Sequence, residues 1–297
     1  PHLITYIESI EENNVVSPIY GNPNDLHKWY YKMADSVLTQ QPDIYLKPLV
    51  DSLIKDLFTE KEKVEKIYYW VQDNIKYIAI EDGLGGYIPR SSKQICTKRF
   101  GDCKDKSYLL HHMLGHAGIK SYMTLIGTRS IPYTFNEVPT TFSINHMIIS
   151  WKDLNNQWRF LDPTAFKLNL YLTASHIQDK EAFILLSRDS FEIAKVPAPA
   201  PAINYRIDTI NAKIINGEIH GIGKSYFGGL WKNDIVNLLL DLSEKHQDND
   251  MKKIFRFGND KCLIKFISAV EKNENENPLT FSYGFELPDV ARVIENT

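Results

Sequence analysis

Three things are scarce in this 297-residue chain, and each scarcity excludes a class of protein. Its three cysteines, Cys96, Cys103 and Cys262, are too few for a disulfide scaffold or a zinc centre, and their odd number leaves at least one thiol free. No apolar run approaches the roughly 20 residues that cross a bilayer, so we expect no membrane insertion. The net charge is only −3, which argues against a nucleic-acid partner held by phosphate contacts.

What the chain does have is the composition of a globular protein with about two domains. It is 43% hydrophobic and 12% aromatic, which is enough to build cores over this length. A Pro-Ala stretch at 196–202 is typical of a linker. We therefore predict a first domain over 23–195 and a smaller β-rich domain over 203–297. Residues 1–22 are interpreted as the end of an upstream module or as an N-terminal extension.

Apolar residues spaced three and four apart predict amphipathic helices in the first domain. The clearest helix follows Thr59, where Glu62 completes a capping-box pattern ahead of an apolar stripe. Another is predicted to begin at Cys103 and to end before Gly118, a common C-terminal signal. The predicted helices of this domain cover residues 26–38, 46–57, 59–75 and 103–117.

Strand-like runs come after the helices in the first domain and dominate the second. Helices followed by strands within one domain are typical of the α+β class, and the second domain is predicted to be sandwich-like, with one helix over 230–242. The predicted strands are 121–126, 144–151 and 158–161 in the first domain, and 206–215, 218–222, 262–270 and 279–285 in the second.

One set of residues could carry out chemistry. Cys103 stands at the entry of a predicted helix, where free N–H groups and the helix dipole favour the thiolate, the nucleophilic form of cysteine. A thiolate of this kind needs a base and a group that orients the base. His146 stands in an otherwise apolar strand, and Asp162 closes the next one. If these strands are antiparallel neighbours, Asp162 faces one nitrogen of His146 while the other nitrogen faces Cys103.

The stretch from about 61 to 164 resembles the transglutaminase-like superfamily of cysteine enzymes. The Gly-Gly-Tyr-Ile-Pro segment at 85–89 looks like the bacterial branch in which this domain is flanked by β-rich modules. The matching pieces are Ile67-Tyr68-Tyr69-Trp70-Val71, Ile75-Lys76-Tyr77, Arg99-Phe100-Gly101-Asp102-Cys103-Lys104-Asp105-Lys106, Asn145-His146-Met147-Ile148 and Leu161-Asp162-Pro163-Thr164.

The resemblance implies a papain-like core, in which a nucleophile helix packs on an antiparallel sheet. It implies that Cys103 is the nucleophile, His146 the general base and acid, and Asp162 the orienting carboxylate. Acyl transfer also requires a hydrogen-bond donor for the oxyanion. The Cys103 backbone N–H is one candidate. The side-chain candidates are Gln94, Trp70 and Tyr77, among which the sequence does not choose.

The function implied is thiol-dependent acyl transfer on a protein, peptide or other amide, most simply hydrolysis by a cysteine peptidase or amidase. Protein-glutamine transamidation and a non-catalytic binding module on the same fold stay open as alternatives. No cofactor and no metal are predicted, because His112 and His116 are four residues apart but lack a convincing third ligand. The resemblance alone suggests a periplasmic or extracellular protein, and no oligomeric state is predicted.

Overall fold

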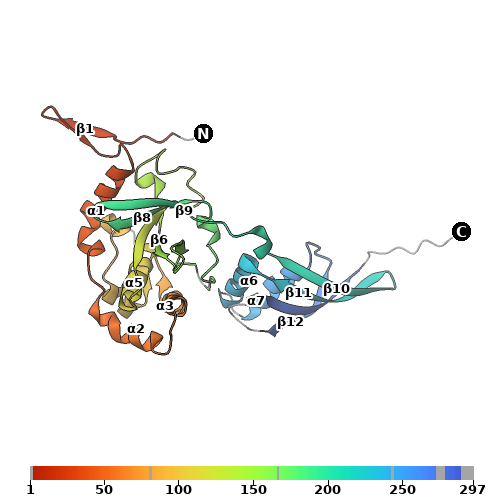
Figure 1. Cartoon of the computed structure of the whole chain (residues 1–297). Coiled ribbons are helices and arrows are strands. Elements are labelled where there is room, and N and C mark those ends of the chain that lie inside the picture. The colour runs from red at the N-terminus through yellow and green to blue at the C-terminus, as the bar shows by residue number, and fades with distance from the viewer. Residues whose placement is uncertain (1–2, 80–81, 166, 242–243, 272–277, 289–297) are drawn as a thin grey trace. The chain divides into compact units, whose positions relative to one another are not determined.

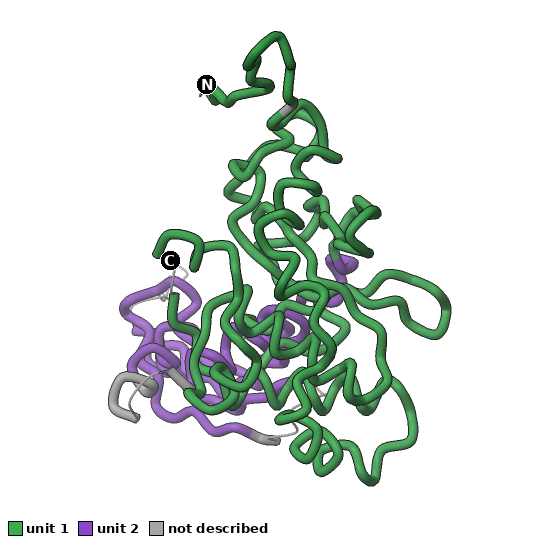
Figure 2. The backbone as a smooth tube through the Cα atoms, turned by 90° about the vertical axis from the view of Figure 1, so that its left-hand side faces the viewer, with its two compact units in different colours: residues 1–198 green, residues 199–297 purple. Residues whose placement is uncertain are grey.

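The computed structural model describes residues 3–79, 82–165, 167–241, 244–271 and 278–288. The chain divides into two compact units, Pro1–Ala198 and Pro199–Thr297 (Figure 2). The division falls inside the Pro-Ala stretch. None of the described helices is both long and apolar enough to cross a membrane.

Unit 1 opens with a small hairpin of β1 (Ser9–Glu12) and β2 (Val15–Pro18), followed by helices (Figure 1). The predicted capping box of the third helix is present, with the Glu62 amide donating to Thr59 Oγ1 at 3.2 Å and the Thr59 amide donating to Glu62 Oε2 at 2.9 Å. The helices are α1 (Pro23–Leu38), α2 (Lys47–Ile54), α3 (Glu60–Asn74), α4 (Ser92–Lys98) and α5 (Cys103–His116), joined by 3₁₀ turns at Ile44–Leu46 and Gly83–Gly86.

Helix α5 is the centre of this unit. Ten of its 14 residues are buried, because α2, α3 and α4 pack against it and its remaining face lies on β5 and β6. The Ser107 hydroxyl donates to the carbonyl of Met147 at 3.0 Å, which ties the helix to β6. The start of α5 is therefore held in a fixed position relative to the start of β6.

The five strands of unit 1's main sheet have the order β7-β6-β5-β8-β9, and all neighbours are antiparallel. All but the last residue of β6 are buried, which explains its nearly continuous apolar sequence. The strands are β5 (Ser121–Ile126), β6 (His146–Lys152), β7 (Trp158–Leu161), β8 (Glu181–Ser187) and β9 (Ser190–Lys195), with 3₁₀ turns at Thr141–Ser143 and Ser175–Ile177. A separate two-residue parallel pair joins β3 (Lys76–Tyr77) to β4 (Phe100–Gly101), directly before α5.

Unit 2 is a four-stranded antiparallel sheet of order β10-β11-β13-β12, with two helices. Its core joins Ile235 and Phe255 of the helices to Phe227 and Tyr283 of the strands. The elements are a 3₁₀ turn at Pro201–Ile203, β10 (Arg206–Ile215), β11 (Glu218–Phe227), α6 (Gly229–Asp241), α7 (Glu244–Phe255), β12 (Leu263–Glu271) and β13 (Leu279–Leu287).

The α+β class is confirmed, and so is the packing of the Cys103 helix on an antiparallel sheet. The sandwich-like second domain is corrected, because among the described residues of unit 2 the helices α6 and α7, and not a second sheet, supply the other layer of the core. Helix α7, whose residues are mostly polar, was not predicted from the sequence, and neither were α4, β8 and β9.

A buried ion pair fixes the entry to α5. Asp105 is fully buried and accepts from the Arg90 amide and from Arg90 Nε, both at 2.9 Å. Arg90 also donates to the Phe100 carbonyl at 2.6 Å, so the pair spans α5 and the strand before it. A Cβ at Gly101 would lie 2.6 Å from Asp105 Cβ, which explains the glycine in this position.

We predict that Asp105→Asn lowers the free energy of unfolding by about 3–5 kcal/mol, because it leaves the Arg90 charge without its buried counter-ion. Urea denaturation measures the loss. The matched control is Asp51→Asn, which breaks the exposed Lys47–Asp51 pair of α2 and should cost less than about 1 kcal/mol. Equal losses in the two variants would contradict a special role for the buried pair.

Candidate functional site

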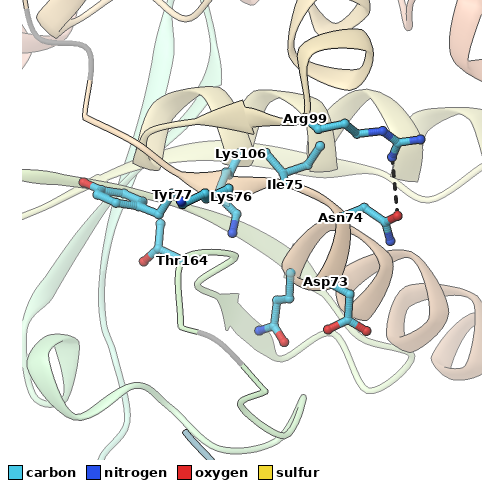
Figure 3. A pocket seen from close by; sticks show the side chains of 9 residues that line it. Asp73, Asn74, Ile75, Lys76, Tyr77, Arg99, Lys106 and Thr164 are labelled. Atoms are coloured by element: carbon cyan, nitrogen blue, oxygen red, sulfur yellow. Dashed lines mark hydrogen bonds between the residues drawn. The ribbon is translucent and has the colours of Figure 1, made fainter. Parts of the chain in front are cut away.

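A pocket of about 380 Å³ opens in unit 1 beside the start of α5 (Figure 3). This volume is within the range of small-ligand sites. The amino group of Lys106 is directed into the space between Thr164 and Asp73. The pocket is lined by residues from the end of α3, from β3 and α5, and from the segments after α4 and β7, namely Gln72, Asp73, Asn74, Ile75, Lys76, Tyr77, Arg99, Lys106 and Thr164.

Cys103 is the first residue of α5, close to this pocket. Asp102 caps the helix, and its carboxylate accepts from the Asp105 amide at 3.2 Å. The Cys103 thiol is free and half-buried, while Cys96 and Cys262 are buried. A thiolate in this position faces the free N–H groups of the first turn and the positive end of the helix dipole.

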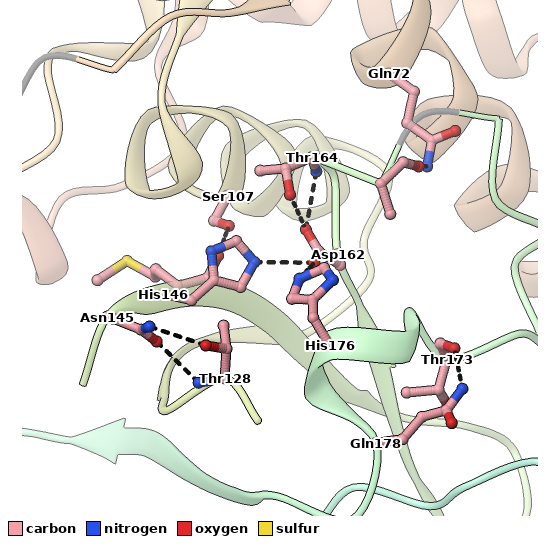
Figure 4. A network of polar contacts seen from close by, with 12 residues as sticks. Gln72, Ser107, Thr128, Asn145, His146, Asp162, Thr164, Thr173, His176 and Gln178 are labelled. Carbon is pink, nitrogen blue, oxygen red and sulfur yellow. Dashed lines mark hydrogen bonds and ion pairs between the residues drawn. The ribbon is translucent and has the colours of Figure 1, made fainter. Parts of the chain in front are cut away.

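His146 begins β6 and lies opposite Ile126 of β5. The residue before it, Asn145, holds the strand entry: its Oδ1 accepts from the Thr128 amide at 2.8 Å and its Nδ2 donates to Thr128 Oγ1 at 2.9 Å (Figure 4). The His146 ring is hydrogen-bonded to Asp162 Oδ2 through Nε2 at 2.9 Å and also to the side chain of Cys103.

Asp162 directly follows β7 and is 2% exposed. Antiparallel pairing of β6 with β7 places it on the same face of the sheet as His146, as the sequence analysis expected. The carboxylate also accepts from the Thr164 amide at 2.9 Å and from Thr164 Oγ1 at 2.6 Å. The Tyr68 hydroxyl of α3 donates to the Asp162 carbonyl at 3.0 Å. The structure thus places His146 between the Asp162 carboxylate, 2.9 Å away, and Cys103, which is close enough to raise the pKa of His146.

The charges of His146 and Asp162 stabilise each other. Burial by itself lowers the pKa of His146, but the charge of Asp162 and the hydrogen bonds to Asp162 and Cys103 raise it to about 10. Burial works the other way on Asp162, yet the charge of His146 and the hydrogen bonds from His146, His176 and Thr164 hold the pKa of Asp162 well below its usual range. An imidazolium next to the Cys103 sulfur is the partner that a catalytic thiolate requires.

His176 is a member of the site that the sequence analysis did not identify. It lies in the Ser175–Ile177 turn, and its Nε2 is 2.9 Å from Asp162 Oδ2, the same oxygen that His146 contacts. Its ring meets the ring of His146 edge-on, with centroids 5.2 Å apart (Figure 4). The surrounding sequence carries no strand or helix pattern, so no local signal indicated the residue.

Among the described residues, the group best suited to bind a metal ion is formed by His146, Asp162 and His176. One ligand atom from each of His146, Asp162 and His176 lies within 4.8 Å of the others. Metal ligation requires a deprotonated imidazole nitrogen, whereas the hydrogen bonds to Asp162 use the Nε2 protons of both histidines. A bound ion would therefore displace the His146–Asp162 interaction.

The predicted oxyanion donors are dispersed over three elements. Gln94 is exposed on α4, and Trp70 is half-buried on α3 with its ring 4.9 Å from the Arg99 guanidinium. Tyr77 is 47% exposed in β3, where it pairs with Gly101. The Cys103 backbone N–H stays a candidate. The structure adds Tyr30 of α1, a fully buried tyrosine close enough to Cys103 for their charges to interact, whose hydroxyl donates to the Tyr87 carbonyl at 3.1 Å.

The histidines on α5 have structural hydrogen bonds. His112 Nδ1 is 2.8 Å from Ser92 Oγ and accepts from the Asp43 amide at 3.1 Å, while His116 Nε2 is 2.8 Å from the Asp43 carbonyl. Burial lowers the pKa of His112 to about 4. These contacts join α5 to α4 and to the segment before α2.

Comparison with known proteins identifies one family. The sequence model described as the transglutaminase-like superfamily matches residues 47–163, which include Cys103, His146 and Asp162. No curated protein matches the chain.

Among solved structures, a "putative protease" from Parabacteroides distasonis is similar at 11% identity and a TM-score of 0.48, covering 97% of this chain and 58% of that one. This chain therefore spans somewhat more than half the length of that protein. A "putative cysteine protease" from Cytophaga hutchinsonii has 21% identity and a TM-score of 0.31, covering 40% of this chain and 37% of that one. Legionella pneumophila LapG, treated with EGTA, has 18% identity and a TM-score of 0.29, covering 45% of this chain and 70% of that one.

We predict that Asp162→Asn lowers the pKa of His146 from about 10 to below its ordinary value of 6.5, because burial then outweighs the lost charge. Histidine ¹⁵N chemical shifts measured against pH report this change. The control is Asp153→Asn in the turn between β6 and β7, which should leave the titration of His146 unchanged.

The raised pKa of His146 also makes the free energy of unfolding depend on pH. Because the pKa of folded His146 lies above 6.5, its protonation stabilises the fold fully below about pH 6.5, and this contribution is lost as pH rises through about 10. The difference in unfolding free energy between wild type and Asp162→Asn should therefore shrink between pH 6.5 and 10. A difference that stayed constant over that window would contradict a charged His146–Asp162 pair.

Proposed function

We propose, on the match of residues 47–163 to the transglutaminase-like superfamily, that unit 1 is a thiol-dependent hydrolase of peptide or related amide bonds. The observation that supports this proposal is the position of Cys103 at a helix N-terminus beside His146, whose Nε2 is hydrogen-bonded to Asp162 at 2.9 Å. The order sulfur, imidazole, carboxylate is the arrangement in which cysteine enzymes activate their nucleophile.

The proposed reaction has two steps. The Cys103 thiolate attacks the amide carbonyl, and His146 gives its proton to the departing nitrogen as the C–N bond breaks, which leaves an acyl-enzyme and a free amine. His146, now neutral, takes a proton from water as the water oxygen attacks the thioester. The carboxylic acid leaves, and the thiolate and imidazolium are restored. Asp162 keeps the imidazole oriented throughout through the 2.9 Å bond to Nε2.

Hydrolysis and transamidation share the first step and differ in what attacks the acyl-enzyme. In transamidation a lysine side-chain amine takes the place of water. Lys106 and Lys76 line the pocket beside the site and Arg99 stands at its rim, and these positive charges disfavour a second ammonium group approaching from that side. This favours water as the acceptor and hence the hydrolase over the crosslinking enzyme.

We predict that Cys103→Ala lowers turnover of a mixed peptide library by at least about a thousandfold, because no other group can form the acyl-enzyme. Mass spectrometry of the products measures cleavage, and inclusion of a primary amine distinguishes hydrolysis from amide exchange. The control is Cys96→Ala, which removes a buried thiol of α4 and should keep activity within a few-fold of wild type. Full turnover by Cys103→Ala would rule out the proposal.

A labelling experiment separates the enzyme from a non-catalytic module without knowledge of the substrate. We predict that iodoacetamide alkylates Cys103 rapidly at pH 6 and that His146→Ala slows the reaction at least about tenfold, because the thiolate loses its imidazolium partner. Peptide mapping assigns the modified residue, with Cys96 and Cys262 as internal references. Slow labelling of Cys103 that is unaffected by His146→Ala would favour the binding module.

A further inference from the structure

A buried cation lies one helical turn beyond the proposed nucleophile. Lys106 is 3% exposed, and its amino group is directed into the 380 Å³ pocket (Figure 3). Burial lowers the pKa of Lys106 to about 8, although the charges of Asp162 and Asp73 oppose the shift. Within the described parts of the chain its amino group forms no ion pair at hydrogen-bonding distance. Such a group is costly to keep unless something pairs with it.

The other charged side chains of the pocket leave it positive. Asp73, the one acidic residue of the lining, is already paired with Lys167 at 3.0 Å. Lys76 and Arg99 add two more positive charges, and neither forms an ion pair with a described residue. Arg99 lies over the Trp70 ring and makes a long 3.5 Å contact with Asn74. A ligand in this pocket therefore meets uncompensated positive charge.

The pocket is connected to the Cys103–His146–Asp162 series at two points. Lys106 follows Cys103 by three positions on α5, a spacing that places two side chains on the same helix face about 5–6 Å apart at Cβ. Thr164 lines the pocket and donates twice to Asp162. A substrate group in the pocket would therefore lie within about one residue of a carbonyl at Cys103.

We propose that this pocket is a carboxylate subsite, in which Lys106 binds a substrate carboxylate next to the bond that is cleaved. The inference rests on the proposed function for its link to cleavage and extends it by naming the substrate class, acidic peptides. The carboxylate can come from two sources, an aspartate or glutamate side chain or the C-terminus of the peptide. Both would form the charge-assisted hydrogen bonds that the ammonium lacks.

Direct binding tests the subsite without requiring turnover. The 297-residue chain with Cys103→Ala is titrated by calorimetry with acetyl-Ala-Glu-Ala-amide, with its Gln counterpart, and with acetyl-Ala-Gln-Ala bearing a free carboxylate. We expect one or both carboxylate peptides to bind at least about tenfold more tightly than the uncharged one. Preference for the Glu peptide identifies a side-chain carboxylate, and preference for the free acid identifies the C-terminus.

Variants then assign the preference to Lys106. Lys106→Met keeps the length of the buried side chain without its charge and should reduce the carboxylate preference to near one. Lys76→Gln, an exposed change at the same pocket, should reduce it about two- to threefold, so the subsite can be tested even if Lys106→Met folds poorly. Lys98→Gln at the end of α4, outside the pocket, should leave the preference unchanged. A structural role for Lys106 would lower stability but would not alter the ratio between matched peptides.

Two outcomes overturn the subsite: equal binding of charged and uncharged peptides, or a carboxylate preference that survives both Lys106→Met and Lys76→Gln. Neither depends on catalysis. Failure of the proposed function shows itself separately, as an absence of Cys103-dependent cleavage in the wild-type protein. A protein that binds carboxylates through Lys106 but cleaves nothing would keep the subsite and exclude the hydrolase.

Discussion

The arrangement of unit 1 depends on one buried carboxylate. Asp162 is 2% exposed and accepts hydrogen bonds from His146, from His176 and twice from Thr164. A charge removed from water costs several kcal/mol unless it is paired and fully hydrogen-bonded, so every element that supplies a donor is bound to the others through this residue. The start of β6, the turn at Ser175–Ile177 and the segment after β7 therefore meet at a single point. Tyr68 of α3 holds the backbone there from the helical side.

The geometry around Asp162 explains how a thiol and an imidazole far apart in sequence come to face each other. The cap of α5 and the Arg90–Asp105 pair hold Cys103 at the helix start, while Ser107 ties the next turn to β6. Asn145 fixes the entry to the same strand. Neither Cys103 nor His146 can move far without breaking a buried polar contact. The positions of Cys103 and His146 are therefore fixed by the fold itself, which is the condition for low reorganisation in the proposed reaction.

Much of this fold and site could be predicted from the sequence, because the signals for them are local. The capping box at Thr59, the apolar run of β6 and the glycine before Asp102 each reflect a constraint within a few residues, and the pairing of β6 with β7 followed from their short connection. The contacts that could not be predicted join residues that are far apart in the sequence. His176 joins the site from an irregular turn, and Arg90 reaches Asp105 across 15 positions. Helix α7 has a largely polar sequence. The role of its apolar side chains Met251 and Phe255 is evident only from their packing in the core of unit 2.

The first turn of α5 also shows how buried charge can point to a ligand. Five consecutive charged or reactive positions follow Gly101, and the four charged ones are all buried. Asp102 pairs with Lys104, and Asp105 pairs with Arg90, so these charges are balanced inside the protein. Lys106 differs because it faces a pocket, and the nearest carboxylates, Asp162 and Asp73, already serve His146 and Lys167. The other buried charges of this turn are paired within the protein, so the unpaired charge of Lys106 does not add to the stability of the helix. This unbalanced charge is the feature that supports the proposed carboxylate subsite.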